Sequence, residues 1–179
     1  MDSCTDYLQT VLKPPFAKII ADKTTALIQD NICRGDYDCI VFRGVSGALI
    51  APIVAYKLGV PVVPVRKGEN SHSSNLIELV GDYVHYLVVD DLISSGDTMR
   101  EILTVCNRHS MHCRGIVLWN ENEWAQVDPA TVGCDGSYDY GSNIFWPYDN
   151  RPSEKYSVYC VGRAADYTKS FPEADDATE

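Results

Sequence analysis

The sequence has none of the long apolar segments that mark a membrane protein. No apolar run among its 179 residues approaches the roughly 20 residues needed to cross a bilayer. The first six residues, MDSCTD, are acidic and polar, and they have neither the basic start nor the apolar stretch of a signal peptide. We therefore expect a cytoplasmic protein with no membrane partner.

Positive charge is also in short supply. Fifteen Lys and Arg residues face 25 Asp and Glu residues, which gives a formal net charge of −10. Such a surface repels nucleic-acid phosphates at long range, so no nucleic-acid partner is expected. An anionic ligand would depend instead on local backbone N–H groups, a few cations and a bound Mg²⁺.

The cysteine pattern argues against a disulfide scaffold or a structural zinc site. Seven cysteines are an odd number, and no two of them have C-x-x-C spacing. No internal repeat, low-complexity tract or linker divides the chain. We expect one domain over residues 1–179, with N-terminal helices at 1–38, a core at 39–119, a cap at 120–165 and a flexible acidic tail at 166–179.

Hydrophobic patterning indicates strands that alternate with helices. It predicts helices at 6–31, 46–58 and 98–108, and strands at 39–42, 60–65, 77–80, 84–89 and 115–119. Pro14 and Pro15 break the first helix, and Pro52 is expected in the first turn of the second. Pro61 and Pro64 should leave one flank of their strand open. The alternation predicts an α/β fold with a parallel sheet.

The most informative segment is LVVDDLISSGDTM at residues 87–99. A strand that is apolar on both faces ends at Asp90 and Asp91, at the edge where open α/β sheets bind ligands. Small residues follow, and then a helix begins, whose N-terminus favours an anion. Thr98 and Glu101 have the spacing of a capping box. The simpler interpretation is a buried strand, two solvated acids and a helix cap.

This segment closely resembles the phosphoribosyl-pyrophosphate motif of the type I phosphoribosyltransferases. The resemblance implies a parallel-sheet core flanked by helices, with a small aromatic-rich C-terminal cap, or hood. It implies that Asp90 and Asp91 hold the ribose hydroxyls and contact the metal, directly or indirectly. It also implies that the 5-phosphate is bound by Ser94, Ser95, Gly96, Asp97 and Thr98.

A glycine-containing turn at residues 43–47, RGVSG, follows the first strand and opens a helix. Alone it is a generic anion cradle, or a simple connection between elements. It resembles the pyrophosphate loop of the same family, in which Arg43 and Gly44 would contact pyrophosphate. Because those loops often hold a non-proline cis peptide, we expect one between Arg43 and Gly44.

Arg66 and Lys67 end the second strand and precede a polar segment. They are either charged residues of a solvated loop or cations that clamp pyrophosphate. The segment resembles the pyrophosphate-binding cations and mobile loop of the orotate and adenine enzymes, and this likeness makes Arg66 and His72 catalytic candidates. Asn70 stands where the orotate enzymes carry a loop lysine, which is a departure from that subfamily.

The base pocket is expected from the cap. Its aromatic element at 143–149, NIFWPYD, resembles the hood of xanthine- and guanine-type members. Phe145 and Trp146 could stack on a base, with Ile93 beside it, and plain core packing is the alternative interpretation of any one of these aromatics.

Together these features predict transfer of a phosphoribosyl group from phosphoribosyl pyrophosphate to a nucleobase, with a purine slightly preferred. Mg²⁺ is the expected cofactor, and a homodimer is the expected state. One alternative is an orotate-type enzyme. Another is a regulator of the same fold that senses phosphoribosyl pyrophosphate, and a third is a partner-binding relative without catalysis.

Overall fold

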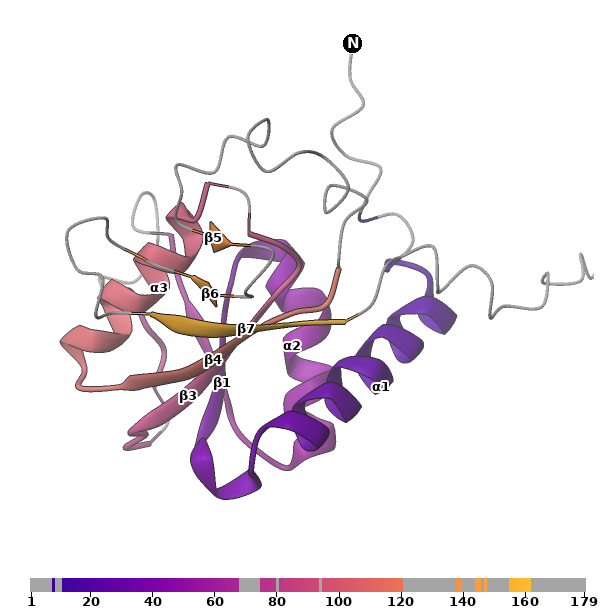
Figure 1. The fold of residues 1–179 in the computed structure, drawn as a ribbon, viewed down its shortest axis with the longest axis horizontal. Coiled ribbons are helices and arrows are strands. Elements are labelled where there is room, and N and C mark those ends of the chain that lie inside the picture. Colours follow the sequence, from indigo (N-terminus) through magenta and orange to yellow (C-terminus); the bar gives the residue numbers. More distant parts are fainter. Residues whose placement is uncertain are drawn as a thin grey trace, which may run out of the picture.

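The computed structural model describes residues 11–67, 75–79, 81–93, 95–120, 138–139, 144–145 and 155–161, with Leu8 and Pro147. Helices and strands alternate through most of this range (Figure 1). In chain order the elements are α1 (Pro14–Asn31), the short 3₁₀ helix η2 (Arg34–Asp36), β1 (Cys39–Arg43), α2 (Gly44–Leu58), β2 (Val62–Val65), β3 (His85–Asp90), α3 (Asp97–Arg108), β4 (His112–Leu118), β5 (Tyr138–Asp139), β6 (Ile144–Phe145) and β7 (Tyr156–Cys160).

One sheet joins the strands in the order β2-β1-β3-β4-β7-β6-β5. Each pair from β2 to β7 in this order is parallel, and only β6 and β5 add antiparallel pairs. The expected α/β fold with a parallel sheet is confirmed. Because parallel strands point the same way, the carboxyl ends of β1 and β3 meet at one edge of the sheet.

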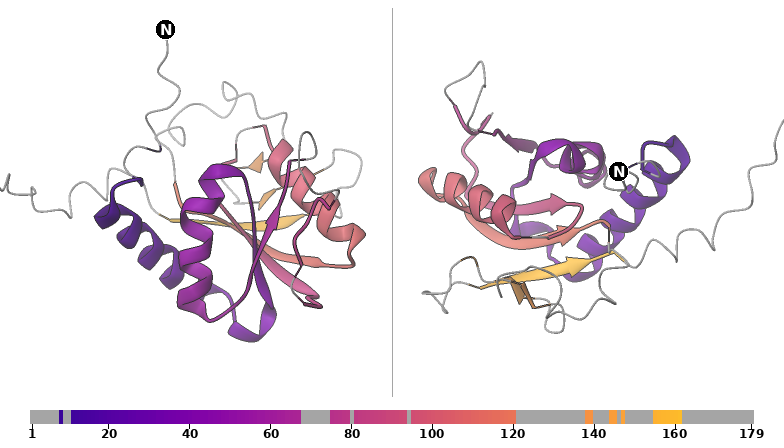
Figure 2. Two further views of the ribbon diagram at one scale, coloured as in Figure 1. Left: turned by 180° about the vertical axis from the view of Figure 1, so that it is seen from behind. Right: turned by 90° about the horizontal axis from the view of Figure 1, so that it is seen from above.

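Alternate residues of the strands supply two hydrophobic layers. Ile40, Leu87 and Val89 pack with α1 and α2 on one face. Val41, Tyr86 and Val88 pack with α3 on the other face. Figure 2 shows α3 on the side of the sheet away from α1 and α2. The side-chain period of two in a strand explains this division, and burial on both faces explains the unbroken apolar runs.

The prolines behave partly as expected. β2 is an edge strand, and beyond it residues 76–78 make only an isolated antiparallel bridge between Ile77 and Val65. Pro14 begins α1, at the first helical position that proline favours. The expectation for Pro52 is wrong, because α2 begins at Gly44 and Pro52 lies inside it. The helix is held by its buried face, including Ile50, Ala51 and Val54, which offsets the proline's lost hydrogen bond.

The C-terminal region differs from the expected cap in one respect. β7 lies within residues 120–165, yet it pairs in parallel with β4 and extends the sheet. The aromatic cap itself stays a prediction, because residues 121–137, 140–143 and 148–154 lie outside the described residues. Within the described residues, no helix combines the length and hydropathy that a membrane crossing requires.

Candidate active site

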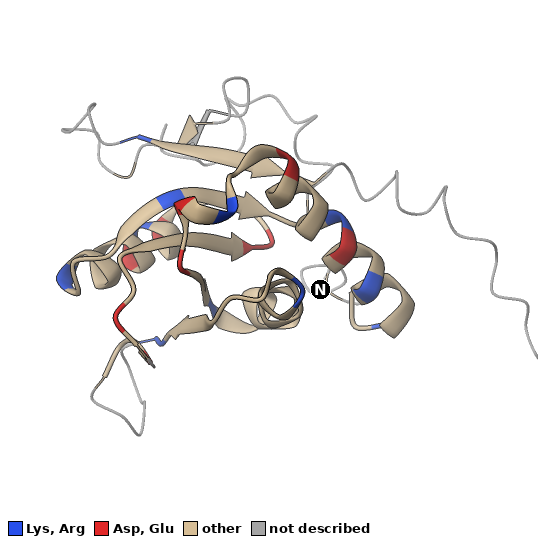
Figure 3. Ribbon diagram, turned by 90° about the horizontal axis from the view of Figure 1, so that it is seen from below, with Lys and Arg blue, Asp and Glu red and all other residues tan. Residues whose placement is uncertain are grey.

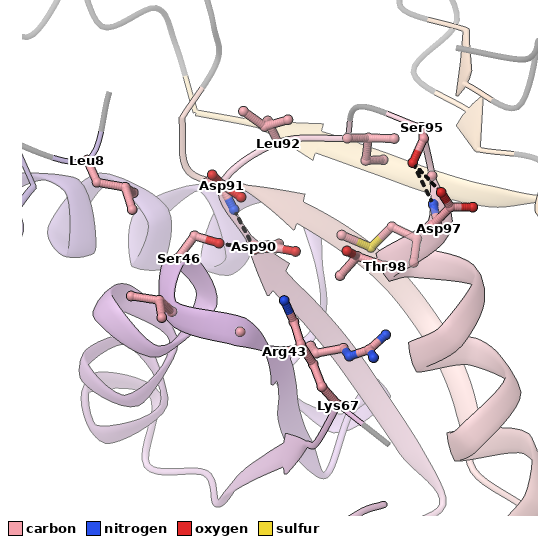
Figure 4. A pocket seen from close by; sticks show the side chains of 15 residues that line it. Leu8, Arg43, Ser46, Lys67, Asp90, Asp91, Leu92, Ser95, Asp97 and Thr98 are labelled. Atoms are coloured by element: carbon pink, nitrogen blue, oxygen red, sulfur yellow. Dashed lines mark hydrogen bonds between the residues drawn. The ribbon is translucent and has the colours of Figure 1, made fainter. Parts of the chain in front are cut away.

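A cavity of about 340 Å³ opens at the carboxyl ends of β1 and β3. The starts of α2 and α3 form its walls, and Lys67 reaches it from the end of β2 (Figure 4). Four separate segments of the sequence therefore meet here. Its polar lining comprises Arg43, Gly44, Ser46, Lys67, Asp90, Asp91, Ser95, Gly96, Asp97 and Thr98. Leu8, Val45, Leu92, Ile93 and Met99 form its apolar lining.

Asp90 and Asp91 are nearly buried, with 3% and 5% of their surfaces exposed. The end of β4 fixes their backbone, since the N–H groups of Trp119 and Asn120 donate to their carbonyls at 2.9 and 3.0 Å. Asp90 Oδ1 accepts hydrogen bonds from Ser46 Oγ at 3.1 Å and from the Asp91 N–H at 2.9 Å. Burial, and then the neighbouring charge of Asp91, raise the pKa of Asp90 to about 8. Two adjacent buried carboxyls, with the pKa of one of them strongly raised, are typical of a functional site.

The turn after Asp91 is built to expose backbone N–H groups. Gly96 has φ +80°, in the left-handed region that glycine adopts most easily, and it is the N-cap of α3. The first intrahelical bond to Gly96 comes from the Arg100 N–H, so the N–H groups before it have no helical carbonyl to bind. An anion placed at Thr98 and Met99 would meet these donors and the positive end of the helix dipole.

Asp97 holds this turn in shape. Its carboxylate accepts from Ser95 Oγ at 2.7 Å and from Arg100 at 2.8 Å, and Arg100 also donates to the Ser95 carbonyl at 2.7 Å. These hydrogen bonds lower the pKa of Asp97, which is exposed. The expected capping box is wrong, because Gly96 caps the helix without a side-chain bond and Glu101 forms an ion pair with Arg43.

The turn between β1 and α2 forms the facing wall. Gly44 has φ +76°, and α2 begins at this residue. The expected cis peptide between Arg43 and Gly44 is wrong: the peptide is trans, and the positive φ of Gly44 makes the sharp change of direction instead. Arg43 is 10% exposed, and burial lowers the pKa of its guanidinium.

The side chains of Lys67 and Arg66 line different cavities, although the two residues are adjacent in sequence. Lys67 lines the cavity, whereas Arg66 lines a different cavity and pairs with Glu78 at 2.7 Å. Successive side chains of an extended chain point to opposite sides, which accounts for the difference. The structure therefore places Lys67 in the candidate site and does not place Arg66 there.

The predicted base-binding residues lie in different surroundings. Ile93 lines the cavity but is 3% exposed. Phe145 is fully buried in the hydrophobic layer that contains α3, so its ring is unavailable for stacking on a base, and its assignment to base binding is corrected. Ser94, His72 and Trp146 lie outside the described residues.

Ser46 is the site residue that sequence reasoning missed. Its hydroxyl donates to Asp90 across 44 positions of sequence. The only available signal was its place in the glycine-containing turn after β1. The sequence of that turn predicts backbone donors alone, because no local pattern pairs a serine with a distant aspartate.

No protein-family model and no curated protein sequence matches the chain. Solved structures are similar to it. Adenine phosphoribosyltransferase from Saccharomyces cerevisiae, complexed with an imino-altritol bisphosphate and adenine, is 21% identical, with 63% of this chain and 72% of that chain covered and a TM-score of 0.55. The adenine enzyme from Thermoanaerobacter pseudethanolicus is 18% identical, with 85% and 82% covered and a TM-score of 0.58. Orotate phosphoribosyltransferase from Aeropyrum pernix is 14% identical, with 92% and 80% covered and a TM-score of 0.58.

Proposed function

Because the chain has the fold of the type I phosphoribosyltransferases, we propose that it transfers a 5-phosphoribosyl group from phosphoribosyl pyrophosphate to a nucleobase and releases pyrophosphate. One observation carries this proposal. The same cavity is lined by a buried pair of carboxyls, by a helix N-terminus that follows a left-handed glycine, and by two cations.

Each part of phosphoribosyl pyrophosphate has a proposed set of binding residues in the cavity. Asp90 and Asp91 hydrogen-bond the ribose 2′- and 3′-hydroxyls. An ionised carboxylate accepts such bonds, and a protonated carboxyl, which the raised pKa of Asp90 favours near neutral pH, can also donate one. The turn from Ser95 to Thr98 binds the 5-phosphate through backbone N–H groups and hydroxyls, and Ser94 is proposed to join it. Lys67 and the turn at Arg43 and Gly44 face the pyrophosphate. Ser46 orients Asp90.

The donor set suits Mg²⁺. In the described part of the chain no three His, Cys, Asp or Glu side chains gather into a metal cluster. The carboxyls that we propose for the ion are those of Asp90 and Asp91, which line the cavity side by side. Mg²⁺ is usually held by one or two carboxylates together with substrate oxygens, and this pair fits that pattern. When bound, the ion would reduce the negative charge of the leaving pyrophosphate.

The chemistry requires no protein nucleophile. The bond between ribose C1 and the pyrophosphate oxygen breaks, the bond from C1 to a base nitrogen forms, and the base nitrogen releases its proton to solvent. The residues act by holding sugar and base in line and by stabilising charge on the departing pyrophosphate. The segment after Lys67, with His72, is proposed to close over the site and exclude water, because hydrolysis is the competing reaction.

A nucleobase is the proposed acceptor, with a purine slightly preferred and orotate as the alternative. Leu92 and Ile93 give the cavity an apolar wall beside the carboxyl pair, where a flat ring could lie. The state is proposed to be a homodimer, which light scattering during size-exclusion chromatography measures directly.

Charge supports an enzyme over a nucleic-acid regulator. Over the described residues, Lys and Arg are spread across several elements and interspersed with Asp and Glu (Figure 3). A regulator that bound DNA or RNA would need a continuous basic face.

The test is a panel of nucleobases incubated with the protein, phosphoribosyl pyrophosphate and Mg²⁺, with pyrophosphate release as the readout. The proposal predicts release that depends on one base and forms the matching nucleoside 5′-monophosphate. Asp91→Asn should abolish it. No release with any base, while the sugar phosphate still binds, would instead support a sensor or a non-catalytic relative.

A further inference from the structure

The turn that is proposed to bind the 5-phosphate carries a negative side chain of its own. Asp97 lines the candidate active site, and 71% of its side chain is exposed. Hydrogen bonds from Ser95 and Arg100 lower the pKa of this carboxyl and so keep it ionised. Because like charges at short distance repel, Asp97 opposes the anion that the same turn should attract. The turn therefore needs a nearby cation to offset this charge.

Arg100 supplies that cation. Its Nη2 atom donates to Asp97 Oδ1 at 2.8 Å and to the Ser95 carbonyl at 2.7 Å. Arg100 follows Asp97 by three positions on α3, a spacing that brings two side chains together. Arg100 does not line the candidate active site but the other cavity, which Arg66 also lines. Its short-range effect on a ligand in the active site therefore passes through Asp97 and Ser95.

The same arginine fixes the direction of a backbone group in the turn. Every peptide bond in the described part of the chain is trans, and the carbonyl and N–H of a trans peptide point in opposite directions. Since the Ser95 carbonyl points to Arg100, the N–H of Gly96 points away from Arg100. Gly96 is a residue at which the backbone rotates easily, and the reversed peptide would offer an anion a carbonyl oxygen. The bond from Arg100 disfavours that reversal.

The hydroxyl of Ser95 completes this network. It donates to Asp97 Oδ2 at 2.7 Å and accepts from the Asp97 N–H at 3.3 Å (Figure 4). Each carboxylate oxygen of Asp97 thus has a donor of its own, Arg100 for Oδ1 and Ser95 for Oδ2. The turn is therefore held in one shape by contacts that need no bound ligand.

We propose that Arg100 is a positioning residue for the 5-phosphate. It holds the turn at residues 95–98 in the shape that receives an anion, and it offsets the charge of Asp97. A site that is ordered in advance loses less binding free energy to the ordering of its loop. Asp97 accordingly braces the turn with its carboxylate and meets the phosphate through its backbone N–H. This inference rests on the proposed function, which identifies the anion.

Calorimetric titration with ribose 5-phosphate tests the inference without catalysis. Arg100→Gln should weaken binding about tenfold, because it removes charge-assisted hydrogen bonds that hold the turn. Arg108→Gln is the matched control, since it makes the same change of charge at an exposed position two turns further along α3. It should change the affinity by less than about twofold. Equal losses in the two variants would overturn the inference, because they would reflect net charge alone.

Backbone amide NMR of the ¹⁵N-labelled protein separates failure of this inference from failure of the proposed function. The proposed function predicts that ribose 5-phosphate shifts the amides of residues 96–98 in the wild type. Absence of these shifts would overturn both proposals. Shifts that saturate at the same ligand concentration in Arg100→Gln as in the wild type would overturn this inference and leave the proposed function standing.

A double-mutant cycle tests whether Arg100 acts through Asp97. Asp97→Asn removes the charge that Arg100 offsets, so in that background Arg100→Gln should weaken ribose 5-phosphate binding only about threefold. A loss of about tenfold in both backgrounds would mean that the two residues act independently, which would contradict the inference.

Steady-state kinetics distinguish positioning from a loss of folded protein. Arg100→Gln should raise KM for phosphoribosyl pyrophosphate about tenfold and keep kcat within about twofold, because Arg100 does not line the cavity in which the reacting atoms would lie. A variant that merely unfolds in part would instead lower kcat and leave KM unchanged, and that result would contradict a positioning role.

Discussion

Asp90 is the residue at which the proposed function and the stability of the fold conflict. Its carboxyl is 3% exposed at the end of β3, beside Asp91, and its pKa is raised to about 8 from the ordinary 3.8. The folded state therefore binds more protons than the unfolded state between these values. By linkage, the contribution of this group to stability is complete below about pH 4 and is lost as the pH rises toward 8.

We predict that Asp90→Asn removes this loss. In the absence of ligand, the variant should exceed the wild type in free energy of unfolding at pH 8 by about 1 kcal/mol or more, and the difference should shrink toward pH 5. Urea denaturation at several pH values measures it, with Asp82→Asn at an exposed position as the control. A wild type that is as stable as Asp90→Asn at pH 8 would mean that Asp90 is not strained by its burial.

Ser46 gives a second prediction at the residue scale. Ser46→Ala deletes the hydroxyl that donates to Asp90 at 3.1 Å. Removing one partner of a buried polar group costs about 1–3 kcal/mol, so kcat/KM for phosphoribosyl pyrophosphate should fall about tenfold. The exposed Ser157→Ala on β7 is the matched control and should keep full activity. Equal activity of the two variants would show that Asp90 needs no positioning by Ser46.

At the scale of elements, the packing of α2 on the sheet depends on Gly47. A Cβ at this position would lie 2.9 Å from Phe42 Cβ and 3.3 Å from the Val89 carbonyl oxygen. Gly47→Ala should therefore destabilise the fold by about 1–3 kcal/mol, despite alanine's higher helix propensity. Gly35→Ala is the control, because nothing lies within 4 Å of the added atom. Thermal denaturation separates them, and equal midpoints would disprove the close approach.

Sequence patterns predict these elements better than their contacts. The consecutive Val88 and Val89 identified a strand buried on both faces, and Pro61 and Pro64 identified an edge strand, because both signals are local. The spacing of Thr98 and Glu101 failed, because Arg43, distant in sequence, attracts the Glu101 carboxylate. β7 has no clear strand pattern, because its residues lie in a segment rich in aromatic and polar side chains. Its position in the sheet is set by pairing with β4, which the sequence does not reveal.

At the scale of the whole molecule, the proposed function requires an acidic chain to bind a strongly anionic substrate. The candidate site resolves this conflict locally, through backbone N–H groups at the start of α3 and through Arg43 and Lys67. The sequence could predict that the end of β3 and the start of α3 line one side of the same cavity, because residues 87–99 form one continuous segment. It could not predict that Arg66 turns away or that Phe145 is buried, because both outcomes depend on tertiary packing.

Calorimetric titration with phosphoribosyl pyrophosphate in the presence of Mg²⁺ tests the central claim most directly. The account predicts one saturable site at the ends of β1 and β3. It predicts that Asp90→Asn and Asp91→Asn each weaken binding about tenfold or more while the fold stays intact. Affinity unchanged by both substitutions would contradict the account, because the buried carboxyl pair would then have no part in holding the sugar.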